Sequence, residues 1–329
     1  MTTMTDRRPH ELLWNLSTAF IASRCLQVVA ELGVADHVGD EPVSAETLAA
    51  RCGADADALE RVLRLLAAHG VFACDGGFRH TPASEMLRTD HPMSLRALVR
   101  MLGLPLHQRV VAALEYTVRT GAPAIETVDA RGVWAYVKDD PRELQLFEEA
   151  MTAKAAADIP EVLNAYDFRR FASIADIGGG RGHLLRAVLD SVPAARGILF
   201  DLPEVVGAFD AGHERMAVHA GDFLADPLPV ADAYLLMDVL HDWPDDDCVR
   251  ILRAIRDASP AATVIIVENA AAGARPEPHA QALDLIMLVM LGGRERTPGE
   301  LNRLLTRAGF TEGTVIETAG PRITEATVA

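Results

Sequence analysis

The stretch IADIGGGRGH, residues 174–183, decides the fold of this chain. An apolar strand end carrying Asp176 runs into glycines at positions 178, 179, 180 and 182. Glycine lets the backbone turn sharply and approach a ligand closely. The segment therefore predicts a strand, a tight turn and a helix whose first amides face a nucleotide-like cofactor.

The glycine spacing narrows the choice of cofactor. A dinucleotide fingerprint is G-x-G-x-x-G, whereas here the closing glycine falls one place early, at Gly182, and His183 takes the expected position. Asp176 two residues before the first glycine, followed by Gly178 and Gly180, favours a cofactor with a ribose and an amino-acid end but no pyrophosphate. S-adenosylmethionine fits this description, and a nicotinamide-dependent oxidoreductase is disfavoured.

Two further strand ends carry polar residues. The apolar run 197–200 stops at Asp201, 25 residues after Asp176. A carboxylate at this position can accept hydrogen bonds from both ribose hydroxyls. A third run ends in Gly221-Asp222-Phe223, which offers a carboxylate for the adenine amino group and an aromatic face for its ring. Each aspartate alone also suits a helix cap or a turn. Their recurrence after successive strands favours cofactor contacts.

The second part of the chain alternates short apolar runs with helical segments, which is typical of an α/β fold. Such alternation predicts a doubly wound, Rossmann-like parallel sheet with ligands at the carboxyl ends of its strands. The last two runs, 314–318 and 322–328, are expected to close one sheet edge as an antiparallel pair. The expected parallel strands are residues 173–177, 197–201, 216–220, 233–238 and 263–268.

The first part predicts a separate domain over residues 1–105, followed by linker helices and the cofactor-binding domain over 106–329. Its pattern is helix, helix and a small wing, which outlines a winged helix. The basic residues of the helical pair, mainly Arg51, Arg61 and Arg64, lie among acidic neighbours. A transcription regulator is therefore disfavoured, and a dimerisation module is the better interpretation.

Composition limits the partners of the chain. The formal charge is −16 over 329 residues, which argues against a nucleic-acid partner and an anionic membrane surface. The four cysteines form no C-x-x-C pair, which fits reduced thiols, no metal site and a cytoplasmic protein. No secretion signal is expected, and the apolar run 283–291 is too short to cross a bilayer.

The expected catalytic group follows the fourth strand. His241 comes just after the strand end, on the side where the cofactor is expected, and imidazole titrates near neutrality as a general base requires. Glu268 ends the fifth strand, and Glu295 follows Gly292-Gly293-Arg294, so both are expected to hold the ring. The alternatives are a backbone contact for Glu268 and an ion pair with Arg294 or Arg296 for Glu295.

The sequence resembles the S-adenosylmethionine-dependent small-molecule O-methyltransferases of the caffeate and acetylserotonin type, including bacterial members that act on secondary metabolites. The resemblance runs from the first helices to the last strand. It is carried by DIGGGRG at 176–182, DLPEV at 201–205, GDF at 221–223, HDW at 241–243 and GGRERTPGEL at 292–301. It implies His241 as general base flanked by Glu268 and Glu295, and no metal. Met237 stands at a cofactor contact where plant members carry lysine.

The acceptor site is expected to involve a planar aromatic substrate. Phe147 and Met151 lie one helical turn apart and match family positions that line this site, while Met287 can pack on an aromatic ring. Asp242 is the fourth candidate for a contact with the acceptor. Core packing is the alternative for Phe147 as well as for the methionines.

The predicted function is methyl transfer from S-adenosylmethionine to a hydroxyl of a small aromatic secondary metabolite, catalysed by a homodimer. The first alternative keeps the cofactor site but has changed its chemistry to hydroxylation or decarboxylation. The second methylates a nitrogen. The sequence does not identify the acceptor.

Overall fold

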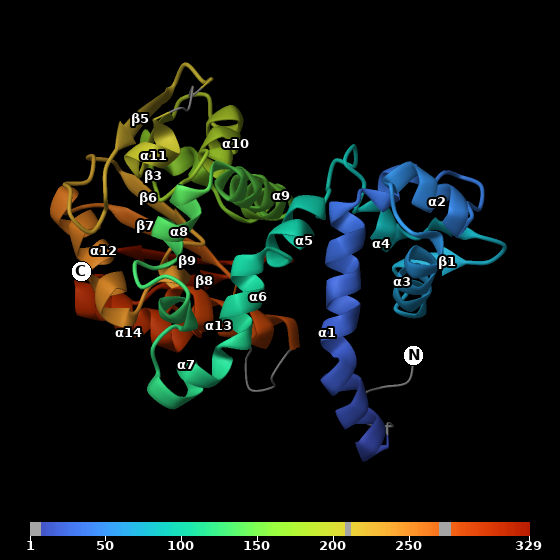
Figure 1. Cartoon of the computed structure of the whole chain (residues 1–329). Helices are drawn as coiled ribbons and strands as arrows, with labels where there is room; N and C mark the ends of the chain where they lie inside the picture. The colour runs from blue at the N-terminus through green and yellow to red at the C-terminus, as the bar shows by residue number, and fades with distance from the viewer. Residues whose placement is uncertain (1–7, 208–211, 270–277) are drawn as a thin grey trace. The chain divides into compact units, whose positions relative to one another are not determined.

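The computed structural model describes residues 8–207, 212–269 and 278–329, and it divides the chain into two compact units (Figure 1). The first unit contains Met1–Gln108 and Arg142–Ala153, and the second contains Arg109–Pro141 and Lys154–Ala329. The expected domain boundary at residue 105 stays a prediction. The backbone contacts of Arg142–Ala153 group this segment with the first unit, whereas the predicted second domain, 106–329, includes it.

The first unit begins with helix α1 (Pro9–Glu31), and Gly33 with φ +64° lies just beyond its end. Ser44 caps the helix that follows it, α2 (Ala45–Cys52), because the Thr47 amide donates to Ser44 Oγ at 3.3 Å. Leu48, Leu63 and Phe72 are almost fully buried and join these elements into one core. The other elements of this part are η2 (Val34–His37), α3 (Ala56–Ala68), β1 (Phe72–Cys74), β2 (Phe78–His80), α4 (Pro82–Glu85), α5 (Arg96–Leu102) and α6 (Pro105–Ala112).

Helix α1 is strongly apolar. Its 23 residues include a window of mean hydropathy 1.2, so by length and composition it is long enough to cross a membrane. The apolar run 283–291 lies in the shorter helix α13 (Pro278–Leu291). Core helices of soluble proteins and signal sequences meet the same criterion as α1. The helix exposes a row of large apolar side chains, which are Leu13, Trp14, Leu16, Phe20 and Ile21.

The second unit confirms the predicted α/β fold. Its sheet has the strand order β5-β4-β3-β6-β7-β9-β8, in which β3 to β7 run parallel and β9 and β8 are antiparallel. The strands are β3 (Ser173–Ile177), β4 (Arg196–Asp201), β5 (Met216–Ala220), β6 (Ala233–Met237), β7 (Thr263–Glu268), β8 (Thr314–Ile316) and β9 (Arg322–Thr327). The chain winds outward from β3 in one direction and from β6 in the other. The gap between their carboxyl ends is the point where such sheets bind ligands.

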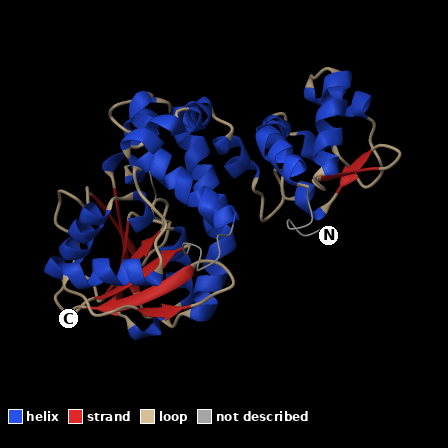
Figure 2. Ribbon diagram, turned by 90° about the horizontal axis from the view of Figure 1, so that it is seen from below, coloured by secondary structure: helices blue, strands red, loops and turns tan. Residues whose placement is uncertain are grey.

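Helices cover the sheet on both faces (Figure 2). Alternate residues of the central strands explain this, because Tyr234 and Leu236 pack in one core while Leu235 packs in the other. The near-continuous apolar sequence of β6 and β7 is typical of parallel strands buried on both sides. Helix α9 (Pro141–Ala165) contributes residues to both units. The remaining helices of this part are α7 (Leu114–Thr120), η3 (Ala124–Thr127), α8 (Val133–Asp139), η4 (Phe168–Arg170), α10 (His183–Ser191), α11 (Pro203–Val206), η5 (Leu240–Asp242), α12 (Asp245–Ala258) and α14 (Pro298–Ala308).

Candidate active site

The glycine turn after β3 brings three strand ends together. Gly178 has φ +68°, and its amide donates to the carbonyl of Phe200 at 2.8 Å. A Cβ added at Gly178 would lie 3.1 Å from Val239 and 3.5 Å from the Phe223 ring. The residues after β3, β5 and β6 therefore face one another at the carboxyl edge of the sheet. Only glycine leaves this space open.

Asp201 faces the same turn. Its Oδ2 accepts from the Gly180 amide at 2.7 Å, and Oδ1 accepts from the Leu202 amide at 2.7 Å. Asp176, in contrast, is buried beneath the turn, where a Cβ on Gly179 would lie 2.5 Å from its carboxyl carbon. Burial raises the pKa of Asp176 to about 7, with a further contribution from the charge of Asp201. Asp176 thus supports the turn from below.

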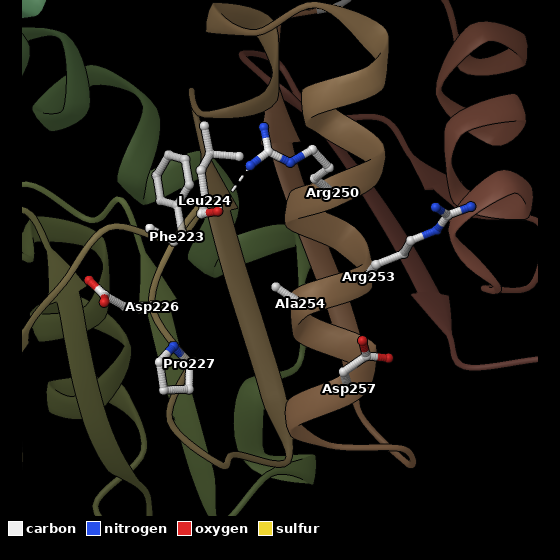
Figure 3. Close-up of a pocket in the computed structure, with 9 residues that line it drawn as sticks. Phe223, Leu224, Asp226, Pro227, Arg250, Arg253, Ala254 and Asp257 are labelled. Carbon is white, nitrogen blue, oxygen red and sulfur yellow. Dashed lines mark hydrogen bonds between the residues drawn. The ribbon is translucent and has the colours of Figure 1, made fainter.

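The loop after β5 carries the Asp222 and Phe223 pair. Asp222 Oδ1 accepts from the Leu224 amide at 2.8 Å, and the Phe223 ring meets the edge of Trp243 at 5.6 Å. On its outer side, this loop and α12 line an open hollow, where Arg250 donates to the Leu224 carbonyl (Figure 3). His241 is not among the residues that line this hollow.

His241 lies in η5, between the carboxyl end of β6 and α12, and is 5% exposed. Its Nδ1 donates to Glu295 Oε1 at 2.8 Å, and Glu295 is itself buried. Glu268 does not contact the ring. Its Oε1 accepts the backbone amide of His241 at 2.9 Å, as in the alternative considered for this residue. Asp242 Oδ1 lies 3.4 Å from the other ring nitrogen, Nε2.

Charges around the imidazole control its protonation. Burial alone would lower the pKa of His241, but the Asp242 carboxylate and the Glu295 hydrogen bond outweigh it and raise the pKa to about 10. Burial raises the pKa of Asp242 to about 6 and that of Glu268 to about 7, although the His241 charge opposes both shifts. The site therefore stabilises an imidazolium.

The backbone of His241 is held on both sides. Its carbonyl accepts the Arg294 amide at 2.8 Å, and a Cβ on Gly293 would lie 2.0 Å from that oxygen. The buried Arg296 guanidinium donates to the carbonyls of Leu240 and Trp243, both at 2.7 Å. The motif after α13 thus fixes the turn that carries the histidine.

The other candidates lie apart from the imidazole contacts. Met237, the last residue of β6, packs against the core on the α10 side of the sheet. Met287 is half-buried in α13. Phe147 and Met151 lie in the first unit, where they pack with a cluster that contains Met101, Leu146 and Ala150. The structure therefore brings His241 together with Glu268, Glu295 and Asp242.

Sequence reasoning missed three contributors to the site. Arg296 and Gly293 were visible in the GGRERT motif, but their contacts with the histidine turn were not. Lys154 in α9 carries no local motif, and its Nζ lies 2.5 Å from Asp238 Oδ2, two residues before the η5 turn begins.

Within residues 8–207, 212–269 and 278–329, no group of three or more His, Cys, Asp or Glu side chains is arranged to hold a metal ion.

Comparison with known proteins gives the family. The model of the O-methyltransferase domain matches residues 112–311, and that of the O-methyltransferase dimerisation domain matches residues 14–90. The chain is 38% identical over 325 residues to the phenazine O-methyltransferase PhzM of Lysobacter antibioticus, which covers 96% of this chain and 95% of the relative. It is 36% identical over 312 residues to an 8-amino-8-demethylriboflavin N,N-dimethyltransferase of Streptomyces davaonensis, covering 90% and 87%.

A similar solved structure contains two bound small molecules. It is an O-methyltransferase from neocarzinostatin biosynthesis in complex with S-adenosylmethionine and 2-hydroxy-5-methyl naphthoic acid. Its TM-score to this chain is 0.80 at 31% identity, with 94% of this chain and 96% of that chain covered. This chain therefore belongs to the O-methyltransferase family and is an S-adenosylmethionine-dependent O-methyltransferase with an N-terminal dimerisation domain.

Proposed function

We propose that the enzyme methylates a hydroxyl of a small aromatic secondary metabolite and that His241 is the general base. The observation that carries this proposal is the buried 2.8 Å contact between His241 Nδ1 and Glu295, at the sheet edge where the glycine turn also lies. A carboxylate on Nδ1 fixes the ring orientation and leaves Nε2 as the nitrogen that exchanges a proton with the acceptor.

The cofactor site fits S-adenosylmethionine on the geometry of the glycine turn. The missing Cβ at Gly178 leaves a cradle beside Phe223, and the contact of Asp201 with the Gly180 amide in the same turn supports Asp201 as the residue that would accept from ribose hydroxyls. When bound, the cofactor supplies an activated methyl group and a positive charge. The residues of the chain then have to orient the acceptor, exclude water and take its proton, and orientation alone can supply about 7–11 kcal/mol in favourable model reactions.

The acid–base balance of the site supports a phenolic acceptor. Asp242 and Glu295 raise the pKa of His241, so they stabilise the imidazolium that forms when the ring takes a proton from a phenol. The same shift leaves little neutral imidazole at pH 7. Since a positive charge beside an imidazolium lowers its pKa, we expect cofactor binding to increase the neutral fraction of His241.

Cofactor binding and product analysis test this function together. Isothermal titration should show binding of S-adenosylhomocysteine and none of NADH, and Asp201→Ala should weaken the former. Mass spectrometry of a panel of phenols incubated with the enzyme and S-adenosylmethionine should then reveal a product heavier by one methyl group. NADH binding, or S-adenosylhomocysteine binding with hydroxylated or decarboxylated products only, would contradict the proposal.

Nitrogen methylation is the second candidate, because the riboflavin relative named above is an N,N-dimethyltransferase. Paired acceptors that differ only in a hydroxyl or an amine at the same ring position separate the two reactions. Preference for the hydroxyl compound is expected. Exclusive turnover of the amine would replace O-methylation by N-methylation as the function.

We further propose that the active enzyme is a homodimer and that a second copy covers the apolar face of α1. Phe20 and Trp14 on this face are 70% and 72% exposed. Contiguous apolar side chains are unfavourable in water, so such a face is typical of an interaction surface. Residues 14–90 match the dimerisation-domain model. Sedimentation should give a dimer for the wild type and a monomer for Phe20→Glu. A wild-type monomer, or binding of the wild type to neutral lipid vesicles through this face, would contradict the assignment.

A further inference from the structure

Asp238 occupies an unusual backbone position just before the histidine turn. Among the described residues it is the one non-glycine residue with a positive φ, at +54°. Aspartate tolerates the left-handed region better than most residues, but the conformation persists only where neighbouring contacts support it. Its amide donates to the Val267 carbonyl at 3.0 Å, so β7 provides one such contact.

Lys154 provides the second contact, through the side chain. Its Nζ lies 2.5 Å from Asp238 Oδ2 and 3.8 Å from Asp158, and the Lys154 and Asp238 side chains are each 21% exposed. Burial alone would lower the pKa of Lys154, but the charge and hydrogen bond of Asp238 outweigh it and raise the pKa. The amine is therefore charged at neutral pH. Removing one partner of such a pair leaves an uncompensated charge in a poorly hydrated place.

The charges that face the imidazole explain why this pair matters. Four carboxylates raise the pKa of His241, while the charge of Lys154 acts on Asp242 and that of Arg296 acts on Glu268. Arg296 is committed to backbone carbonyls and to Asp245, which leaves Lys154 as the partner of Asp238. The carboxylates are Asp238, Asp242, Glu268 and Glu295, contributed by the segment from β6 to η5, by β7 and by the loop after α13.

We propose that Lys154 is a positioning residue of the methyl-transfer site: its ammonium pairs with Asp238, holds the left-handed residue that precedes the histidine turn, and limits the negative potential on His241. This inference rests on the proposed role of His241 as general base. Lys154 acts through Asp238 and not on the acceptor. Its loss therefore changes the titration of the imidazole as well as the rate.

The test is an NMR titration of His241 in the cofactor-free enzyme with isotope-labelled histidine, with the signal assigned by its loss in His241→Asn. Lys154→Met removes the cation that offsets Asp238, so the imidazole pKa should rise by roughly half a unit or more. The neutral fraction at pH 7 then falls about threefold, which should also shift the acid limb of the pH profile of kcat/KM upward.

Matched variants separate charge from structure. Lys154→Arg keeps the charge and should titrate like the wild type, whereas Lys154→Met combined with Asp238→Asn removes both charges and should restore the lower pKa. Arg170→Met breaks an ion pair with Glu325 elsewhere in the second unit and should leave His241 unchanged. If Lys154→Met does not fold, Asp238→Asn alone serves, and it should lower the imidazole pKa.

An unchanged His241 titration in Lys154→Met, or an equal shift in the single and double variants, would overturn the proposal. The failure of the proposed function is a different result. Wild-type turnover in His241→Ala would remove the base assignment, while the NMR titration would still report whether Lys154 controls the imidazole.

Discussion

Replacing Glu295 by glutamine is expected to change both the rate and the pH dependence of methyl transfer. The substitution keeps the shape of the side chain, and the amide oxygen can still accept from His241 Nδ1. It removes the negative charge from a contact of 2.8 Å in which the Glu295 side chain is 1% exposed. A glutamine nitrogen can occupy the place of Oε2, which is buried without a hydrogen-bond partner among the described residues.

The size of the effect follows from the charge of the bond. Hydrogen bonds to charged groups contribute about 1.5–3 kcal/mol, and one pKa unit corresponds to about 1.4 kcal/mol. The pKa of His241, raised to about 10 in the wild type, should therefore fall by about one to two units in Glu295→Gln. If the same energy is lost from the imidazolium formed in the transition state, the maximal rate falls about tenfold to a hundredfold.

The assay is the initial rate of methyl transfer across the pH range at constant ionic strength, for wild type and variant, with thermal unfolding as a control for folding. A neutral base is needed, so kcat/KM rises with pH through the titration of His241. In Glu295→Gln, kcat/KM should level off at a smaller maximal value than in the wild type, and it should do so at a lower pH. A folded variant with an acid limb at the wild-type pH would refute the electrostatic role of Glu295.

Three further predictions concern the support of the site. Gly293→Ala should abolish transfer because its Cβ would lie 2.0 Å from the His241 carbonyl oxygen, whereas Gly299→Ala, with no atom within 4 Å of its Cβ, should remain active in the same assay. Arg296→Met should lower the free energy of unfolding by about 1–3 kcal/mol in urea titrations, since the backbone carbonyls of Leu240 and Trp243 lose their donor while Asp245 is half exposed to water; an unchanged free energy of unfolding would show that these hydrogen bonds do not stabilise the histidine turn. Asp176 has its pKa raised to about 7, so the folded state binds this proton more tightly than the unfolded chain, and the wild type should lose stability as pH rises from about 4 to 7. Asp176→Asn should lose less over that window, and equal losses in both proteins would contradict the assignment.

The fold was predictable because its strands differ clearly from their surroundings. The run Thr263–Glu268 is apolar until its last residue, and every residue of β7 is buried. A buried parallel strand has this continuous pattern, and the polar residue marks its end. The same reasoning located β3 and β4, whose ends carry Gly178 and Asp201. Local sequence therefore predicts which residues lie at the carboxyl edge of the sheet, where such folds bind their ligands.

The contacts within the site were harder to predict, because they join distant positions. His241 and Glu295 are 54 residues apart, and their contact was expected only from the motif that each belongs to. Glu268 was expected to hold the ring, but its carboxylate accepts the backbone amide of His241. The exact position of the strand end decides between these two contacts, and local sequence does not determine it. Lys154 and Asp238 are 84 residues apart and neither carries a motif, so no local pattern predicts the pair.

The role of His241 as general base is tested most directly by single-turnover methyl transfer in His241→Ala with saturating S-adenosylmethionine and an identified phenolic acceptor. We expect the rate to fall by about a hundredfold to ten-thousandfold, while the affinity for S-adenosylhomocysteine stays at the wild-type value. Transfer at the wild-type rate in this variant would show that orientation of the acceptor suffices and that the imidazole is not the base.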